Sequence, residues 1–187
     1  MSKRIFIALK AEPGPGLLKL LHEAGSTPGA GRIKWVDPGN LHITLAFLGD
    51  TEEERITVAS MVLQRICSST GPFSFSLKGL GVFRNFRDLK VIWVGTDHEE
   101  ELVLLGKRLS EGLKDAGFRL EKKEFVPHIT LGRIKVPGDN EHIKSYVVHN
   151  SETFFQEIKV EEIILFESIL KPAGPVYKAL GKFRLKS

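Results

Sequence analysis

The chain of 187 residues is long enough for one full-sized domain or for two small lobes that share an interface. Hydrophobic residues make up 42% of it and charged residues 27%, a balance typical of globular proteins that argues against disorder. The net charge of +4 and the pI near 9.2 are compatible with an anionic partner such as phosphate or nucleic acid, but they do not identify one.

The single cysteine and the N-terminus exclude several further classes. Cys67 alone allows no intramolecular disulfide and no cysteine-rich metal site, and we expect it to be a small buried or half-buried residue. The apolar run at residues 5–9 is interrupted by Lys10 and is too short for a signal peptide or a membrane span. We therefore expect a cytoplasmic protein that does not bind membranes, and we expect a monomer.

Apolar periodicity predicts a mixture of strands and helices along the chain. Strands are expected at residues 5–9, 41–48, 73–77, 89–94, 125–133 and 163–170. Helices are expected at residues 17–25, 52–66, 99–116 and 139–148. Thr51, which precedes three glutamates, is expected to cap the second helix. Because the strands return in hairpin-like fashion, we expect an α+β fold with antiparallel sheets rather than a doubly wound parallel sheet.

The tetrapeptide His-Ile-Thr-Leu occurs twice, at residues 42–45 and again at 128–131, separated by close to half the chain. Chance predicts only roughly 0.26 His-x-Thr pairs for this composition. No linker rich in proline or serine divides the chain, so residues 1–187 are expected to form one bilobal domain with one motif in each lobe. Duplication of a lobe would explain the repeat.

The motif spacing points to a chemical site. Alternate residues of a strand share a face, so His42 and Thr44 point one way, as do His128 and Thr130, while residues 43, 45, 129 and 131 point into the core. Imidazoles titrate near neutral pH, so one can accept a proton while the other donates one. Such a quartet suits displacement at phosphorus. The alternative is that both strands simply carry exposed polar pairs.

These motifs resemble the two-histidine (2H) phosphoesterase superfamily, and within it the bacterial and archaeal RNA 2′,3′-cyclic phosphodiesterases, historically called 2′-5′ RNA ligases. Arg4-Ile-Phe-Ile-Ala-Leu, Asn40-Leu-His-Ile-Thr-Leu and Pro127-His-Ile-Thr-Leu-Gly-Arg are similar to segments of that family and occur in its order. The resemblance spans nearly the whole chain. It implies two pseudo-symmetric lobes, each an antiparallel sheet with helices packed outside, and an active-site cleft between them.

The resemblance also implies an activity and roles for the site residues. RNA or nucleotide 2′,3′-cyclic phosphates would be hydrolysed to 2′-phosphates without a metal or other cofactor, and reversal would give ATP-independent 2′-5′ RNA ligation. His42 would be the general acid that protonates the leaving 3′ oxygen, and His128 the general base that activates water. Thr44, Thr130 and Arg133 would hold the phosphoryl oxygens, where charge grows in the transition state.

Other residues near the motifs have two interpretations each. Aromatic side chains could stack on a base or belong to the core, and the candidates are Trp35, Phe47, Phe83 and Phe86. Arg84 and Arg87 could follow an RNA backbone or be solvated surface. Arg133 could contact the phosphate or form a surface ion pair at the rim of the cleft.

Competing classes of protein explain less of the sequence. His98-Glu-Glu-Glu lacks the second histidine of the His-Glu-x-x-His metal motif, and no Walker-type loop precedes a Lys-Ser or Lys-Thr pair. A non-catalytic RNA-binding module is the main alternative of a different class. It would explain the basic charge and the aromatic residues but would leave the paired His-x-Thr motifs unexplained.

Overall fold

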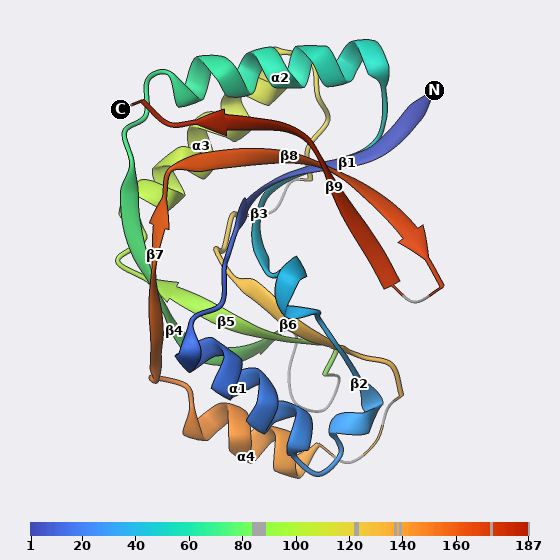
Figure 1. Ribbon diagram of the computed structural model, residues 1–187, viewed down its shortest axis with the longest axis vertical. Helices are drawn as coiled ribbons and strands as arrows, with labels where there is room; N and C mark the ends of the chain where they lie inside the picture. The colour runs from blue at the N-terminus through green and yellow to red at the C-terminus, as the bar shows by residue number, and fades with distance from the viewer. Residues whose placement is uncertain (84–88, 122–123, 137, 139, 173, 187) are drawn as a thin grey trace.

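The computed structural model describes residues 1–83, 89–121, 124–136, 138, 140–172 and 174–186. These residues form an α+β protein with four α-helices and one curled antiparallel sheet of nine strands (Figure 1). The strand order is β7-β4-β5-β6-β3-β1-β8-β9, and the short β2 pairs with β6. The predicted fold class is confirmed, with the addition that the two antiparallel half-sheets are continuous.

The first half-sheet makes the upper lobe in Figure 1. Its strands are β1 (Ser2–Lys10), β3 (His42–Glu52), β8 (Glu162–Lys171) and β9 (Gly174–Arg184). Its outer face is covered by α2 (Glu53–Cys67) and α3 (Glu100–Asp115). Four leucines of α3 recur at helical spacing and are fully buried, so they form the apolar stripe that attaches this helix: Leu102, Leu105, Leu109 and Leu113.

The second half-sheet makes the lower lobe. Its strands are β2 (Ile33–Trp35), β4 (Phe73–Phe83), β5 (Val91–Asp97), β6 (Ile129–Ile134) and β7 (Phe154–Val160). Its helices are α1 (Pro15–Ser26) and α4 (Glu141–His149), and two short 3₁₀ helices, η1 (Ala30–Arg32) and η2 (Pro38–Asn40), flank β2. The chain crosses between the lobes several times, because α1 follows β1 but packs on β7, and α3 follows β5 but packs on β3.

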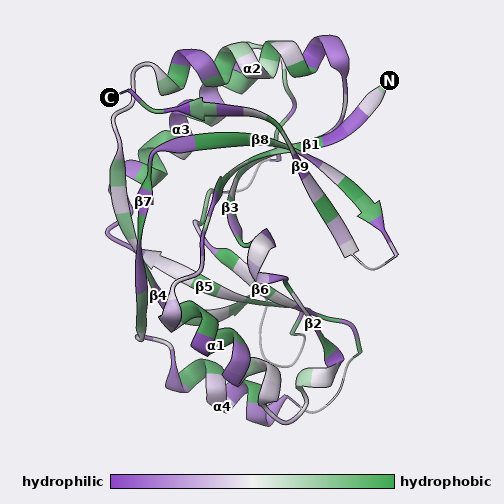
Figure 2. Cartoon of the chain, viewed as in Figure 1, coloured by the Kyte–Doolittle hydropathy of each residue, from purple (hydrophilic) through white to green (hydrophobic). Residues whose placement is uncertain are grey.

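The two half-sheets join at one antiparallel pair, Ile43 on β3 with Ile129 on β6, which we call the seam. Both isoleucines belong to the main core, as do Leu45 and Leu131, so the predicted inward-facing positions are confirmed. A smaller cluster of Phe6, Ala8, Ile164 and Phe166 lies apart from that core. The middle of β8 is therefore buried on both faces, and Figure 2 shows it as a continuous hydrophobic stretch.

Three expectations need correction. Thr51 does not cap α2: it lies within β3, and its hydroxyl donates to the carbonyls of Leu48 and Gly49 at 3.4 and 3.1 Å. The strand expected over residues 125–133 begins only at Ile129. The short β2 was not predicted, and both β7 and β9 were missed because apolar and polar residues alternate irregularly there.

Two remaining expectations concern Cys67 and the membrane. Cys67 is buried as expected, and burial raises the pKa of its thiol to about 11, so it is not a reactive thiolate at neutral pH. In the described part of the chain, no helix has both the length and the apolar character needed to cross a membrane.

Candidate active site

The seam brings the two His-x-Thr motifs together. Residues that flank an opposed antiparallel pair lie on the other face of the sheet, so position 42 lies beside position 130, and position 44 beside position 128. His42 is the first residue of β3, and His128 immediately precedes β6. The motifs are thus related by a local two-fold symmetry, and they share the face opposite the core isoleucines.

Each imidazole is held by the carbonyl of the residue two positions before it. Nδ1 of His42 lies 2.7 Å from the carbonyl oxygen of Asn40, and Nδ1 of His128 lies 2.7 Å from that of Val126. A carbonyl oxygen can only accept a hydrogen bond, so each Nδ1 carries a proton and donates it. Nε2 is therefore an acceptor in the neutral ring and a donor in the protonated ring. Either histidine can act as base or acid through Nε2.

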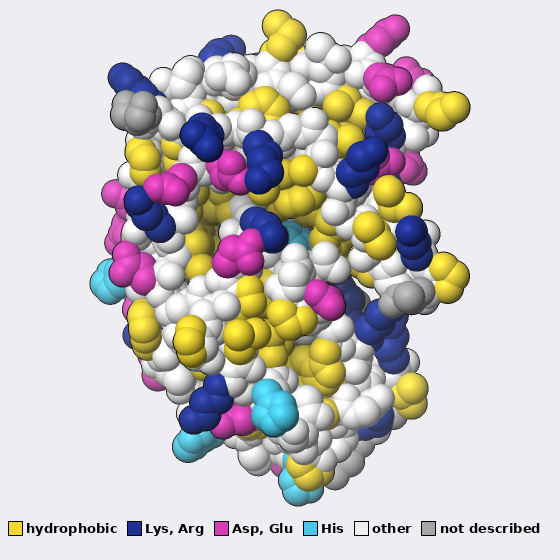
Figure 3. Space-filling model, viewed as in Figure 1, with side chains coloured by type: hydrophobic (Ala, Val, Ile, Leu, Met, Phe, Trp, Pro, Cys, Tyr) yellow, Lys and Arg dark blue, Asp and Glu magenta, His cyan; other side chains and the backbone are white. Residues whose placement is uncertain are grey.

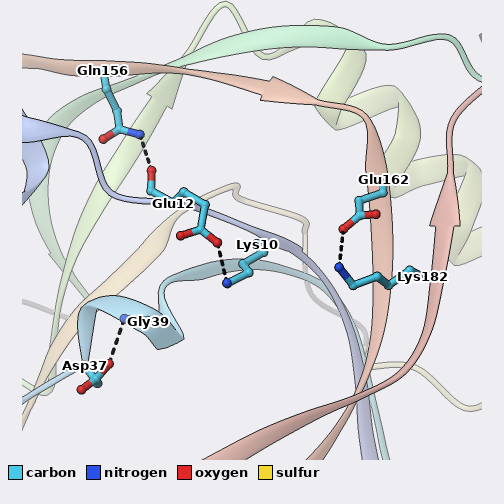
Figure 4. Close-up of polar contacts among 7 residues, drawn as sticks. All are labelled: Lys10, Glu12, Asp37, Gly39, Gln156, Glu162 and Lys182. Carbon is cyan, nitrogen blue, oxygen red and sulfur yellow. Dashed lines mark hydrogen bonds and ion pairs between the residues drawn. The ribbon is translucent and has the colours of Figure 1, made fainter.

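The carbonyl that orients His42 belongs to a short, well-braced turn. The Asp37 carboxylate accepts a 2.8 Å hydrogen bond from the Gly39 amide, as Figure 4 shows, and the Asn40 amide donates to the Asp37 carbonyl, also at 2.8 Å. Pro38 pre-sets the backbone at the first position of η2. The Asn40 side chain also donates to the Pro175 carbonyl at 3.5 Å, which ties the turn to β9. His42 is thus oriented by the fold itself.

Aromatic rings pack against His42 on the side of the first half-sheet. The ring centroids of Phe6 and Tyr177 lie 5.1 and 5.2 Å from that of the imidazole, with Tyr177 edge-on. Phe6 also stacks on Phe166 at 5.2 Å. These contacts fix the plane of the His42 ring, since aromatic pairs of this kind prefer defined geometries.

His128 has a matching aromatic wall in the second half-sheet. Phe83 lies 4.7 Å from its ring, edge-on, and Trp93 lies 6.4 Å away. Trp93 is opposite Gly81 on β4, and a Cβ added to Gly81 would come within 2.2 Å of the indole. A glycine is therefore required at this position for the indole to lie against β4. Trp93 is also the cross-strand partner of Thr130.

Burial and neighbouring charges set the protonation of the two histidines. Burial is the largest cause that lowers the pKa of His42, followed by the charges of His128 and Arg133, while the bond to Asn40 opposes them. The pKa of His128 is lowered by burial and then by Arg133, against the bond to Val126. The His42 pKa therefore depends on whether His128 is protonated.

The charge of Arg133 acts on three titratable groups of this cleft. Besides the histidines, its charge acts on Tyr177, whose pKa is raised by burial and lowered in part by Arg133 and Arg4. Among the described residues Arg133 forms no ion pair. Its exposed guanidinium therefore provides positive charge that reaches both imidazoles, and this charge favours the approach of an anion.

The remaining sequence candidates divide between the cleft and other places. Phe83 lies at the cleft against His128. Phe47 is 41% exposed farther along β3 under the Arg4 guanidinium, and within the described chain it makes no ring contact with either imidazole. Trp35 packs on Gly132 and lines a small internal pocket, so it belongs to the core. Arg84, Phe86 and Arg87 lie outside the described residues.

A pocket of about 220 Å³ opens beside His42. Its lining comes only from the first half-sheet and the η2 turn: Lys10, Gly39, Asn40, Leu41, His42, Ile164, Phe166, Tyr177, Ala179 and Lys182. Figure 3 shows a hollow between the lobes with a hydrophobic floor and with both basic and acidic side chains around its margin. Sequence reasoning missed Phe6, Trp93 and Tyr177, since no local pattern reports a contact with a distant histidine.

No group of three or more His, Cys, Asp or Glu side chains in the described ranges lies close enough together to hold a metal ion.

Comparison with known proteins gives consistent matches across the chain. Residues 30–169 match the 2′-5′ RNA ligase superfamily. The RNA 2′,3′-cyclic phosphodiesterase of Archaeoglobus fulgidus is 39% identical over 183 residues, covering 96% of this chain and 99% of that protein. The protein of the same name from Methanothermobacter thermautotrophicus is 34% identical over 154 residues, covering 82% and 83%.

Solved structures agree with these matches. The TT0787 protein of Thermus thermophilus has a TM-score of 0.79 and 31% identity, and the alignment covers 98% of both chains. Apo LigT of E. coli also gives a TM-score of 0.79, covering 100% of this chain and 99% of that one. Its identity is 24%, so this second likeness shows the fold alone.

Proposed function

Because this chain belongs to the 2′-5′ RNA ligase superfamily, we propose that it hydrolyses 2′,3′-cyclic phosphates at RNA or nucleotide ends to 2′-phosphomonoesters. The observation that carries the proposal is the symmetric pair of imidazoles. Each imidazole has Nδ1 bonded to a backbone carbonyl and Nε2 available for proton transfer. The positive charge of Arg133 lowers the pKa of both histidines. Relatives that are 34–39% identical over most of their length carry the name of this activity.

The reaction places the phosphorus between the two histidines. Nε2 of neutral His128 accepts a proton from water as the water oxygen bonds to phosphorus. The bond from phosphorus to O3′ breaks on the opposite side, and protonated His42 donates its Nε2 proton to that oxygen. The phosphate stays on O2′. His128 ends protonated and His42 neutral, and proton exchange with solvent restores both. A 5′-hydroxyl in place of water would give a 2′-5′ linkage without ATP.

Charge develops on the non-bridging phosphoryl oxygens during this displacement. Arg133 supplies a fixed positive charge, and the hydroxyls of Thr44 and Thr130 supply hydrogen bonds without adding charge. Burial lowers the pKa values of both histidines. The anionic phosphate acts in the opposite direction, because a negative charge between the rings raises the pKa of the imidazole that must be protonated. The ligand therefore helps to create the acid that its own hydrolysis requires.

The test is hydrolysis of adenosine 2′,3′-cyclic phosphate and of a short RNA with a 2′,3′-cyclic end, after exhaustive EDTA treatment, with product ends mapped. We expect only 2′-phosphate, and we expect folded His42→Ala and His128→Ala to lose about 10²–10⁴-fold in kcat. RNA binding without turnover would instead support a non-catalytic module. Activity lost to EDTA and restored by Zn²⁺, Mg²⁺ or Mn²⁺ would mean a metal-activated water.

The cellular setting is part of the proposal. We expect a cytoplasmic monomer that acts on RNA ends or small nucleotides with a 2′,3′-cyclic phosphate. Gel filtration and cell fractionation test these two properties.

A further inference from the structure

The 220 Å³ pocket beside His42 breaks the two-fold symmetry of the site. The pocket has His42 in its wall, whereas neither His128 nor any residue of the second half-sheet contributes to it. Its volume lies below the roughly 300–1,000 Å³ typical of drug-sized ligands, so it can take one nucleoside unit at most. The cleft therefore contains, on the His42 side, a pocket that can bind a small organic group.

The proposed reaction directs the nucleoside to that side. In an in-line displacement the attacking water and the leaving oxygen lie on opposite sides of the phosphorus. If His128 activates the water, then O3′ lies at His42, and the ribose that carries O3′ must lie beyond it. The floor of the pocket that would contact this ribose is apolar and is formed by Ile164, Phe166 and the ring of Tyr177. Together with the polar residues Asn40, Lys10 and Lys182 in the lining, this apolar floor matches the mixed apolar and polar surface of a nucleoside.

Two lysines border the pocket and share its face of the sheet. Lys10 is the cross-strand partner of His42. Lys182 is opposite Ile164, which in turn is opposite Ala8, so Lys182 lies two strands from β1 on the same face. Two strand spacings across the sheet and two residues along β1 put the two Cα atoms roughly 12 Å apart, a separation that two lysine side chains can close on one phosphate. Figure 4 shows the Lys182 side chain extending from β9 in the direction of Lys10, whose own ammonium group is turned toward Glu12.

We infer that this pocket receives the nucleoside that carries the cyclic phosphate, and that Lys10 and Lys182 bind its 5′-phosphate. The protein therefore prefers RNA ends and 5′-phosphorylated nucleotides to nucleoside 2′,3′-cyclic phosphates. This inference rests on the proposed function and on His42 as the acid. Each lysine also needs to be available to such a phosphate.

The existing partners of the lysines leave them available. Lys10 pairs with Glu12, and Lys182 pairs with Glu162 at 3.2 Å (Figure 4). The Lys10 and Lys182 side chains are 43% and 62% exposed, and ion pairs this exposed to water are weak. A phosphate can therefore replace the carboxylate partner at little cost. In its absence the glutamates neutralise the two ammonium groups.

The experiment compares adenosine 2′,3′-cyclic phosphate with its 5′-phosphorylated form. We expect the wild-type protein to favour the 5′-phosphorylated substrate in kcat/KM by about tenfold or more at low salt, falling as salt rises. Lys10→Gln and Lys182→Gln should each reduce that ratio, and the double variant should bring it close to one. Lys144→Gln is the matched control, because Lys144 also pairs with a glutamate, at 3.6 Å, and is 46% exposed, but lies on α4 and does not line the pocket. Its ratio should stay at the wild-type value.

Product binding separates failure of this inference from failure of the proposed function. Calorimetry compares adenosine 2′-phosphate with adenosine 2′,5′-bisphosphate, whether or not the protein turns over substrate. Tighter binding of the bisphosphate, lost in the double variant, supports the subsite even if no cyclic phosphate is hydrolysed. Equal affinity for the two ligands overturns the subsite even in an active enzyme, and a preference that survives in the double variant overturns the role of the lysines.

Discussion

Truncating Ile129 to alanine perturbs the one residue pair that joins the two half-sheets. Ile129 is fully buried and opposes Ile43, which is 1% exposed, so the removed atoms leave a cavity at the seam. Substitutions of this kind cost about 2–5 kcal/mol. That is a large part of the roughly 5–15 kcal/mol by which domains are stable, but it leaves a folded population at low temperature.

The cavity should affect catalysis more than its cost in stability explains. Ile129 is bonded to His128 and opposes the neighbour of His42, so collapse of the seam changes the separation between the two Nε2 atoms. A misplacement of about 1 Å can reduce a rate by roughly 10²-fold. We therefore expect kcat of folded Ile129→Ala to fall by up to about 100-fold. Ile129→Val removes one methylene, costs about 0.5–1.5 kcal/mol and should leave kcat nearly unchanged.

Leu63→Ala is the matched control. Leu63 is also fully buried, but it lies on α2, on the outer side of the first half-sheet. Urea unfolding measures the stability of each variant, and kcat is then measured at a temperature where circular dichroism shows that all are folded. If Ile129→Ala retains the same kcat as Leu63→Ala, the seam does not position the histidines and the reasoning is wrong.

Further predictions concern the histidines and their surroundings. With an activated phosphodiester whose leaving group needs little protonation, His42→Ala should recover much of its lost rate while His128→Ala stays inactive; the opposite pattern would exchange acid and base. Because burial lowers both histidine pKa values, the alkaline limb of kcat/KM should lie below about pH 6.5, and that of kcat should lie higher, since bound phosphate favours the imidazolium. Below about pH 6.5 the histidines of the unfolded chain bind protons more readily than those of the folded chain, so the folded state loses stability as the pH falls. Above that pH the rings are neutral in both states and the free energy of unfolding no longer depends on them. Urea titrations at pH 5 and 7 measure the difference. Gly81→Ala should displace Trp93 and lower kcat through His128, whereas an unchanged kcat would show that the indole contact is dispensable.

The parts of the site that sequence could predict are those written in local patterns. Both His-x-Thr motifs alternate with core residues, so their strands and their faces follow from a period of two. The pairing of Ile43 with Ile129 does not follow, because register between distant strands depends on how whole layers pack. The partners of the two rings were missed for the same reason. Tyr177 lies in a strand with weak alternation, and its contact with His42 joins residues far apart in the chain.

The identical backbone restraint on the two imidazoles has a consequence for regioselectivity. Since both Nδ1 atoms donate to a carbonyl two residues back, the rings are equivalent in tautomer, and neither is intrinsically committed to one direction of proton transfer. With His42 as the acid, whether O2′ or O3′ leaves depends on which of these two oxygens faces His42 when the sugar is bound. Reshaping the apolar wall at Phe166 or Ala179 could therefore convert a 2′-phosphate product into a 3′-phosphate product while both histidines remain in place.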